Sequence, residues 1–76
     1  MKKYILIQKE SNTPWKEYKE EFDTLQDAQE RMHQMYRDVA INGAELIEAA
    51  GYKDTEAYAE FEDHNVVSWS IEEYEG

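Results

Sequence analysis

Residues 56–72 read EAYAEFEDHNVVSWSIE, and this stretch decides the fold that we expect. Two runs of alternating apolar and polar residues flank Asp63-His64-Asn65, so the stretch predicts a β-hairpin with a three-residue loop. In that register one face is entirely apolar: Phe61 opposite Val67, Ala59 opposite Trp69, and Ala57 opposite Ile71. The other face pairs Glu62 with Val66, Glu60 with Ser68, Tyr58 with Ser70, and Glu56 with Glu72. A slip by one residue would expose Trp69 and bury carboxylates, so the register should be well specified.

A helix is predicted to precede this hairpin. Thr24 supplies a capping hydroxyl, and Asp27, three residues on, completes a variant of the capping box. Apolar residues then recur close to the 3.6-residue period: Leu25, Ala28, Met32, Met35, Tyr36 and Val39. Asn42-Gly43 predicts a left-handed stop. Met32 and Met35 would also suit an adaptable binding groove, but at this spacing they are more typical of the core.

The remaining segments complete an α+β domain. Tyr4–Gln8 is apolar on both alternating sets, which predicts a strand that is central or covered on both faces. Lys16–Phe22 predicts a second strand, with Tyr18 and Phe22 opposite a row of mixed charge. Residues 44–50 are expected to form a short helix ended by Gly51 or to continue the first helix. The expected order is ββαββ: one domain, residues 1–76, in which a small antiparallel sheet carries one main helix on one face.

The charge is distributed unevenly along the chain, whose formal net charge is −10. Residues 54–76 carry eight acids and no lysine or arginine. These acids are Asp54, Glu56, Glu60, Glu62, Asp63, Glu72, Glu73 and Glu75. Residues 1–22, by contrast, hold five lysines and four glutamates. Because the acidic third is also rich in strand-forming residues, we expect a folded surface of one sign that meets something positive or repels something negative.

The sequence offers little for catalysis, metals or cofactors. The two histidines, His33 and His64, lie apart, on the helix and in the hairpin loop, so they do not form a metal site together. His64 stands between Asp63 and Asn65, two residue types that favour turns, so this segment is expected to form the turn of the hairpin. No calcium-loop motif or glycine-rich phosphate loop is present. Glu60 and Glu62 fall on the outer face of the hairpin rather than in a cleft, which favours a solvated acidic face over acid–base catalysis. We therefore expect neither an enzyme nor a bound cofactor.

The outward row of the hairpin is the candidate partner-binding surface. Residues that share a face of a strand lie about 6.6 Å apart, so a sheet holds their carboxylates in regular rows. DNA also presents rows of negative charge, with a phosphate about every 3.4 Å of axis per strand. Arginines of a basic groove would fork onto the carboxylates, while Tyr58 and Tyr74 stack beneath them. The candidate residues are Glu56, Tyr58, Glu60, Glu62, Asp63, Glu72, Glu73 and, separately, Trp15.

In size, acidity and lack of cysteine, the chain resembles small inhibitors encoded by phages and mobile elements. The resemblance rests on composition and on the row Glu56, Glu60, Glu62, Asp63, Glu72, Glu73 and Glu75. Some of these anti-restriction and anti-CRISPR proteins mimic nucleic acid, and they share no common fold. The resemblance implies an inhibitor that presents its acidic face to the basic nucleic-acid-binding surface of a CRISPR or restriction nuclease complex. The lack of cysteine fits a cytoplasmic location.

A second interpretation stays open. Negative charge also keeps proteins soluble, so the acidic residues can form a surface that only contacts solvent. The chain is then a small accessory domain that binds a partner through an edge strand or through Trp15. Trp15, just after Pro14, is either such an anchor or a cap on the end of the core. A homodimer formed by pairing free sheet edges is a third possibility. Direct binding of nucleic acid or of an anionic membrane is not expected, because the chain is acidic.

Overall fold

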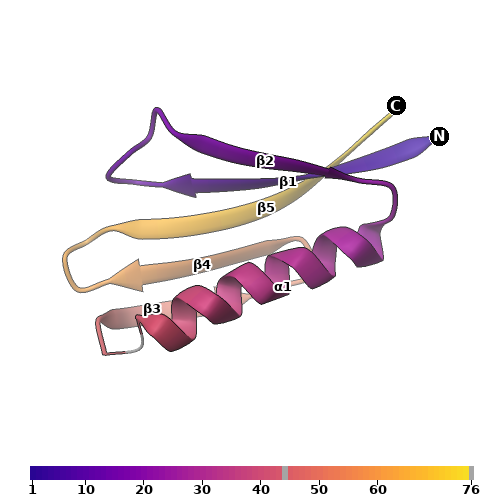
Figure 1. The fold of residues 1–76 in the computed structure, drawn as a ribbon. Helices are drawn as coiled ribbons and strands as arrows, with labels where there is room; N and C mark the ends of the chain where they lie inside the picture. The colour runs from indigo at the N-terminus through magenta and orange to yellow at the C-terminus, as the bar shows by residue number, and fades with distance from the viewer. Residues whose placement is uncertain (44, 76) are drawn as a thin grey trace.

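The computed structural model describes residues 1–43 and 45–75, in which a five-stranded antiparallel sheet carries one helix on one face (Figure 1). In chain order the elements are β1 (Lys2–Glu10), β2 (Glu17–Phe22), α1 (Leu25–Asn42), β3 (Ile47–Tyr52), β4 (Glu56–Phe61) and β5 (Val66–Glu75). Their order across the sheet is β2-β1-β5-β4-β3. The central strand is therefore β5, and the two edges are β2 and β3.

The predicted α+β class is confirmed, but the predicted ββαββ order is wrong because the segment after α1 forms an additional strand. Residues 44–50 were expected to be helical; Ala44 lies outside the described residues, and β3 begins at Ile47 and runs through Gly51 to Tyr52. A helix of this length is marginal in isolation, whereas β3 gains a ladder by pairing with the second edge of β4. Tertiary pairing thus overrides the local helical preference of an alanine-rich segment.

The predicted start of α1 is confirmed, and its end is right in position but not in conformation. The Asp27 N–H donates to Thr24 Oγ1 at 3.1 Å, which is the expected cap. Gly43 follows the last helical residue with φ −108°, so the predicted left-handed stop is wrong. A Cβ atom at Gly43 would lie 2.8 Å from Phe61 Cε1. A side chain at this position would therefore require the Phe61 ring to shift.

The core lies between α1 and the sheet. Its buried residues are Leu6, Ala28, Met32, Ala57, Ala59, Val67, Trp69 and Ile71. Met32 is fully buried, so it fills the core rather than a binding groove. Trp69 is 2% exposed, and its Nε1 donates to Gln8 Oε1 at 2.8 Å. The ring of Tyr36 meets the indole edge-on, with ring centroids 6.0 Å apart.

The terminal hairpin has the predicted faces but not the predicted register. The observed partners are Glu56 and Ser70, Ala57 and Trp69, Tyr58 and Ser68, Ala59 and Val67, and Glu60 and Val66, a shift of two residues. Because side chains alternate with a period of two, the shift leaves every residue on its expected face. The loop is Glu62–His64, closed by a 2.9 Å bond from the Phe61 N–H to the Asn65 carbonyl, and His64 takes the left-handed conformation, φ 71°.

Asn65 explains why the register shifts. Its side-chain oxygen accepts from the Asn12 N–H at 3.1 Å and from the Ser11 hydroxyl at 3.2 Å. The Ser11 hydroxyl in turn accepts from the Val66 N–H at 2.9 Å. These bonds tie the β4–β5 loop to the β1–β2 loop and hold Asn65 outside the turn, directly before the first residue of β5. Asp63 keeps its predicted role, since its carboxylate accepts from the Asn65 N–H at 3.0 Å.

The side of the sheet away from α1 is called the open face, because no described element covers it (Figure 1). Of the two alternatives predicted for β1, a position inside the sheet is the one observed, since β1 lies between β2 and β5 and only one of its faces is covered by α1. Leu6 lies under the helix and is fully buried. Ile7 points to the open face yet is only 8% exposed, with Lys19 and Ser70 beside it in register. Neighbouring side chains, rather than a second layer, shield this strand.

Candidate protein-binding surface

The strand order separates the basic and acidic parts of the chain. The β1–β2 hairpin and its five lysines lie on one side of β5, and the β3–β4 hairpin lies on the other. Residues 45–63 contain seven acids and a single base, Lys53. We call these acids the acidic margin: Glu45, Glu48, Asp54, Glu56, Glu60, Glu62 and Asp63.

Every ion pair among the described residues includes a residue of the first 23, the part of the chain that holds β1 and β2. They are Met1 N-terminus–Glu75, Lys2–Glu73, Lys3–Glu21, Lys3–Asp23, Lys19–Glu17 and Arg31–Glu20. None of these pairs includes a member of the acidic margin. The margin's carboxylates therefore face solvent without a neutralising partner among the described residues.

The predicted row of binding residues is divided by the fold. Glu56, Tyr58 and Glu60 share the open face of β4, whereas Glu62 and Asp63 lie in the β4–β5 loop. Glu72 lies on the open face of β5 in register with Ile5 of β1. Glu73 is on the opposite side of β5 and pairs with Lys2 at 3.1 Å. The antiparallel pairing of β1 with β5 sets the amino-terminal lysines beside the carboxy-terminal acids and so removes Glu73 from the row.

Two acids of the margin, Glu45 and Glu48, were missed from the sequence. Glu45 lies in the turn before β3 and Glu48 is the second residue of that strand, and the Glu62 N–H donates to the Leu46 carbonyl between them at 2.8 Å. Ala49 is the register partner of Glu60, so β3 brings these acids next to those of β4. Because residues 44–50 were predicted to be helical, no sequence signal placed them beside the hairpin.

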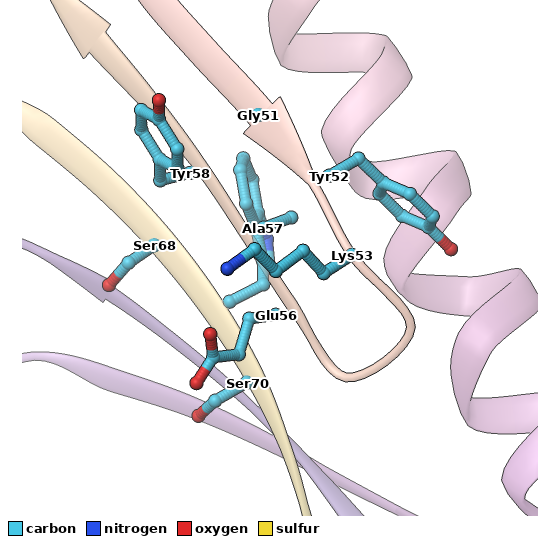
Figure 2. Close-up of a pocket in the computed structure, with 9 residues that line it drawn as sticks. Gly51, Tyr52, Lys53, Glu56, Ala57, Tyr58, Ser68 and Ser70 are labelled. Carbon is cyan, nitrogen blue, oxygen red and sulfur yellow. The ribbon is translucent and has the colours of Figure 1, made fainter.

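A shallow hollow of about 570 Å³ lies on the open face beside Gly51 (Figure 2). The ring of Tyr58 covers Gly51 so closely that a Cβ there would lie 2.6 Å from Tyr58 Cε1. The hollow is lined by Gly51, Tyr52, Lys53, Glu56, Ala57, Tyr58, Ser68, Trp69 and Ser70. Figure 2 shows Ser68 beside Tyr58, with Ser70 and the Glu56 carboxylate further along the two strands and the Lys53 side chain between the tyrosine ring and Glu56. An aromatic face with oxygen acceptors suits a cationic or hydrogen-bond-donating side chain.

The two histidines lie away from the hydroxyls of this hollow in the described part of the chain. Neither histidine is among its lining residues. His33 stacks at a tilt on Tyr52, with centroids 5.0 Å apart, and His64 is in the β4–β5 loop. Within residues 1–43 and 45–75, no group of three or more histidine or acidic side chains is arranged to hold a metal ion.

Trp15 lies in the β1–β2 loop and is 75% exposed. The alternative that it caps the end of the core is therefore wrong. Its exposure leaves the other interpretation, an anchor for a partner, as a prediction.

The surroundings of two tyrosines, Tyr52 and Tyr74, raise the pKa of their hydroxyls. A hydrogen bond from its hydroxyl to the Glu21 carboxylate raises the pKa of Tyr74 above 10.0, and burial, with a smaller effect of Asp54, raises the pKa of Tyr52 above 10.0. These contributions to stability are present below about pH 10 and are lost as the pH rises through the folded-state pKa values. Ultraviolet titration of phenolate should show a late phase in the folded protein.

The denatured chain is the control for this titration, because its tyrosines should ionise together near pH 10. Tyr74→Phe should reduce the late phase by one tyrosine. A titration curve of the folded protein that coincides with that of the denatured chain would contradict the prediction.

No helix among the described residues is long and apolar enough to cross a membrane. Comparison of the chain with protein-family models, with curated proteins and with solved structures found no match.

Proposed function

We propose that this chain binds a basic protein surface and thereby blocks the access of nucleic acid to it. The target is a nucleic-acid-binding protein such as a CRISPR or restriction nuclease complex. One observation carries the proposal: seven carboxylates and one lysine occupy residues 45–63, and no ion pair of the described residues involves them.

The geometry of β4 supports binding to arginine-rich surfaces. Glu56 and Glu60 flank Tyr58 on one face of the strand, and successive residues on this face are about 6.6 Å apart. The strand holds these carboxylates in place, so little conformational freedom is lost when a partner pairs with them. Tyr58 is 45% exposed and offers a ring on which a guanidinium can stack.

The separation of the two hairpins preserves this charge. The β1 strand is two places from β4, about 10 Å at the usual strand spacing. This distance is comparable to the screening length of about 8 Å at physiological salt. The exposed lysines of β1 therefore neutralise the acidic margin only weakly, and a basic target meets a negative potential there.

A second candidate function rests on a different observation, the 75% exposure of Trp15. Tryptophan is enriched among the residues that dominate the binding energy of protein interfaces, so an exposed tryptophan can anchor a partner. In that case the chain is an adaptor, and the acidic margin contributes only solubility.

Affinity capture separates the two functions. The immobilised chain is exposed to cell lysate at low salt, bound proteins are identified, and elution is followed with rising salt and with added DNA or RNA. Our proposal predicts capture of a nucleic-acid-binding protein that is released by salt and displaced by nucleic acid. The Trp15→Ala variant should capture the same protein. A partner that is indifferent to salt and nucleic acid but is lost with Trp15→Ala would replace the proposal with the adaptor function.

A further inference from the structure

The two edges of the sheet differ in how well they are protected from pairing with another strand. The β2 edge reads Glu-Tyr-Lys-Glu-Glu-Phe, and charged side chains on both of its faces discourage an added strand. The β3 edge reads Ile-Glu-Ala-Ala-Gly-Tyr. Its stretch Ala49–Gly51 has no charge, no proline and no bulky side chain, and only Glu48, at the bulge before Ala49, guards its start.

The hydrogen bonds of β3 show which of its backbone groups are available. The Lys53 N–H donates to the Glu56 carbonyl at 2.7 Å, which closes the β3–β4 hairpin. In an antiparallel ladder, bonded residues alternate with residues whose N–H and C=O groups point away from the partner strand. Counting back from Lys53, Gly51 bonds to β4, whereas Ala50 and Tyr52 direct their backbone groups outward. The edge thus offers two donors and two acceptors in strand geometry.

We propose that β3 accepts an extended, arginine- or lysine-bearing segment of the target as a sixth strand of the sheet. The inference rests on the proposed function and specifies how the target docks. Main-chain bonds to Ala50 and Tyr52 supply affinity, as in other cases of strand addition. The charge of the segment follows from the surroundings of the edge, where Glu48, Glu56 and Glu60 outnumber Lys53.

The hollow on the open face can bind a side chain of the added strand and so select which residue stands beside Gly51. A residue of the added strand beside Gly51 meets no side chain on β3, because glycine has none. A long cationic side chain at that position crosses β3 to the exposed ring of Tyr58, at the end of the hollow away from Glu56 and Lys53 (Figure 2). A second copy of this chain is a poorer occupant, since it brings a further net charge of −10 and another Glu48 to the same edge.

A nuclear magnetic resonance titration with a defined peptide tests the inference. The probe is Arg-Thr-Arg-Thr-Arg-Thr, and the matched control is Arg-Pro-Arg-Pro-Arg-Pro, which keeps the charge but cannot form a ladder. Saturation with the probe should slow hydrogen exchange of the Ala50 and Tyr52 amides at least about tenfold, because both become bonded. The largest shifts should fall on β3 and on Tyr58, and the proline peptide should cause neither effect.

Two substitutions locate the binding edge. Glu48→Lys should weaken binding of the probe by about tenfold, whereas the same charge change at Glu17 on the β2 edge should leave it unchanged. Unchanged amide exchange at saturation, equal binding of the proline peptide, or shifts centred on β2 would overturn the inference. Protection of the same two amides in the peptide-free chain, together with a dimer in sedimentation, would assign the edge to a second copy instead.

The failure of this inference can be told apart from the failure of the proposed function. If nucleic-acid-displaceable capture of a basic protein persists while the edge tests fail, only the docking mode is wrong. If no such protein is captured, the proposed function is wrong as well.

Discussion

Replacing Trp69 by alanine is expected to lower the free energy of unfolding by about 3–5 kcal/mol. The indole is 2% exposed, packs between α1 and the central strand, and donates to Gln8 at 2.8 Å. Removing it leaves a cavity under the helix and an amide oxygen without its donor. A chain of 76 residues has a total stability of only about 4–11 kcal/mol, so this single change should populate the unfolded state substantially.

Urea denaturation followed by far-ultraviolet circular dichroism measures this effect. Trp15→Ala is the matched control. The indole of Trp15 is 75% exposed, so this change should alter the free energy of unfolding by less than about 0.5 kcal/mol. Trp15→Phe leaves Trp69 as the sole tryptophan, and its fluorescence should show a buried indole in the folded state. Equal losses of stability at the two tryptophans would contradict the core that we describe.

Reversing the charge of Glu60 and Glu62 to lysine is expected to weaken binding to the captured target by on the order of 100-fold at low salt. Each change removes an attraction and places a positive charge against a basic surface. The fold should persist, because neither side chain forms an ion pair in the described residues and Glu62 is exposed in the loop. Affinity of the unaltered chain should also fall steeply as salt is raised from about 50 to 500 mM, because screening weakens these contacts.

The control for this pair has the same change in net charge at a different place. Glu30→Lys with Asp38→Lys alters two acids of α1, which lies on the opposite side of the sheet from the open face. This variant should retain most of the affinity if the position of the charge matters. Equal losses in the two double variants would show that net charge alone governs binding and would exclude the acidic margin as a specific surface.

Local patterns in the sequence predicted the elements whose stability depends on neighbours in the chain. Thr24 and Asp27 located the start of α1 because a cap is made within one turn. The alternation around Trp69 identified the buried face of the hairpin, because only one assignment buries the apolar residues. That assignment survived a register error of two residues, since such a shift preserves the faces.

Features that depend on distant partners were not predictable in this way. Residues 44–50 look helical on their own, yet β3 forms because β4 has a second edge to pair with. The register shift depends on Asn65 bonding to Ser11 and Asn12, more than fifty residues away in the chain.

The sequence showed that the last third of the chain is acidic. Which of these acids share one surface depended on the order of the strands in the sheet. Pairing of β1 with β5 placed Lys2 against Glu73, while the same order kept every lysine of the first hairpin away from β4. Alternation and capping are short-range and can be read from consecutive residues. Charge neutralisation acts through space, so the candidate site emerged only when the strands were arranged beside one another.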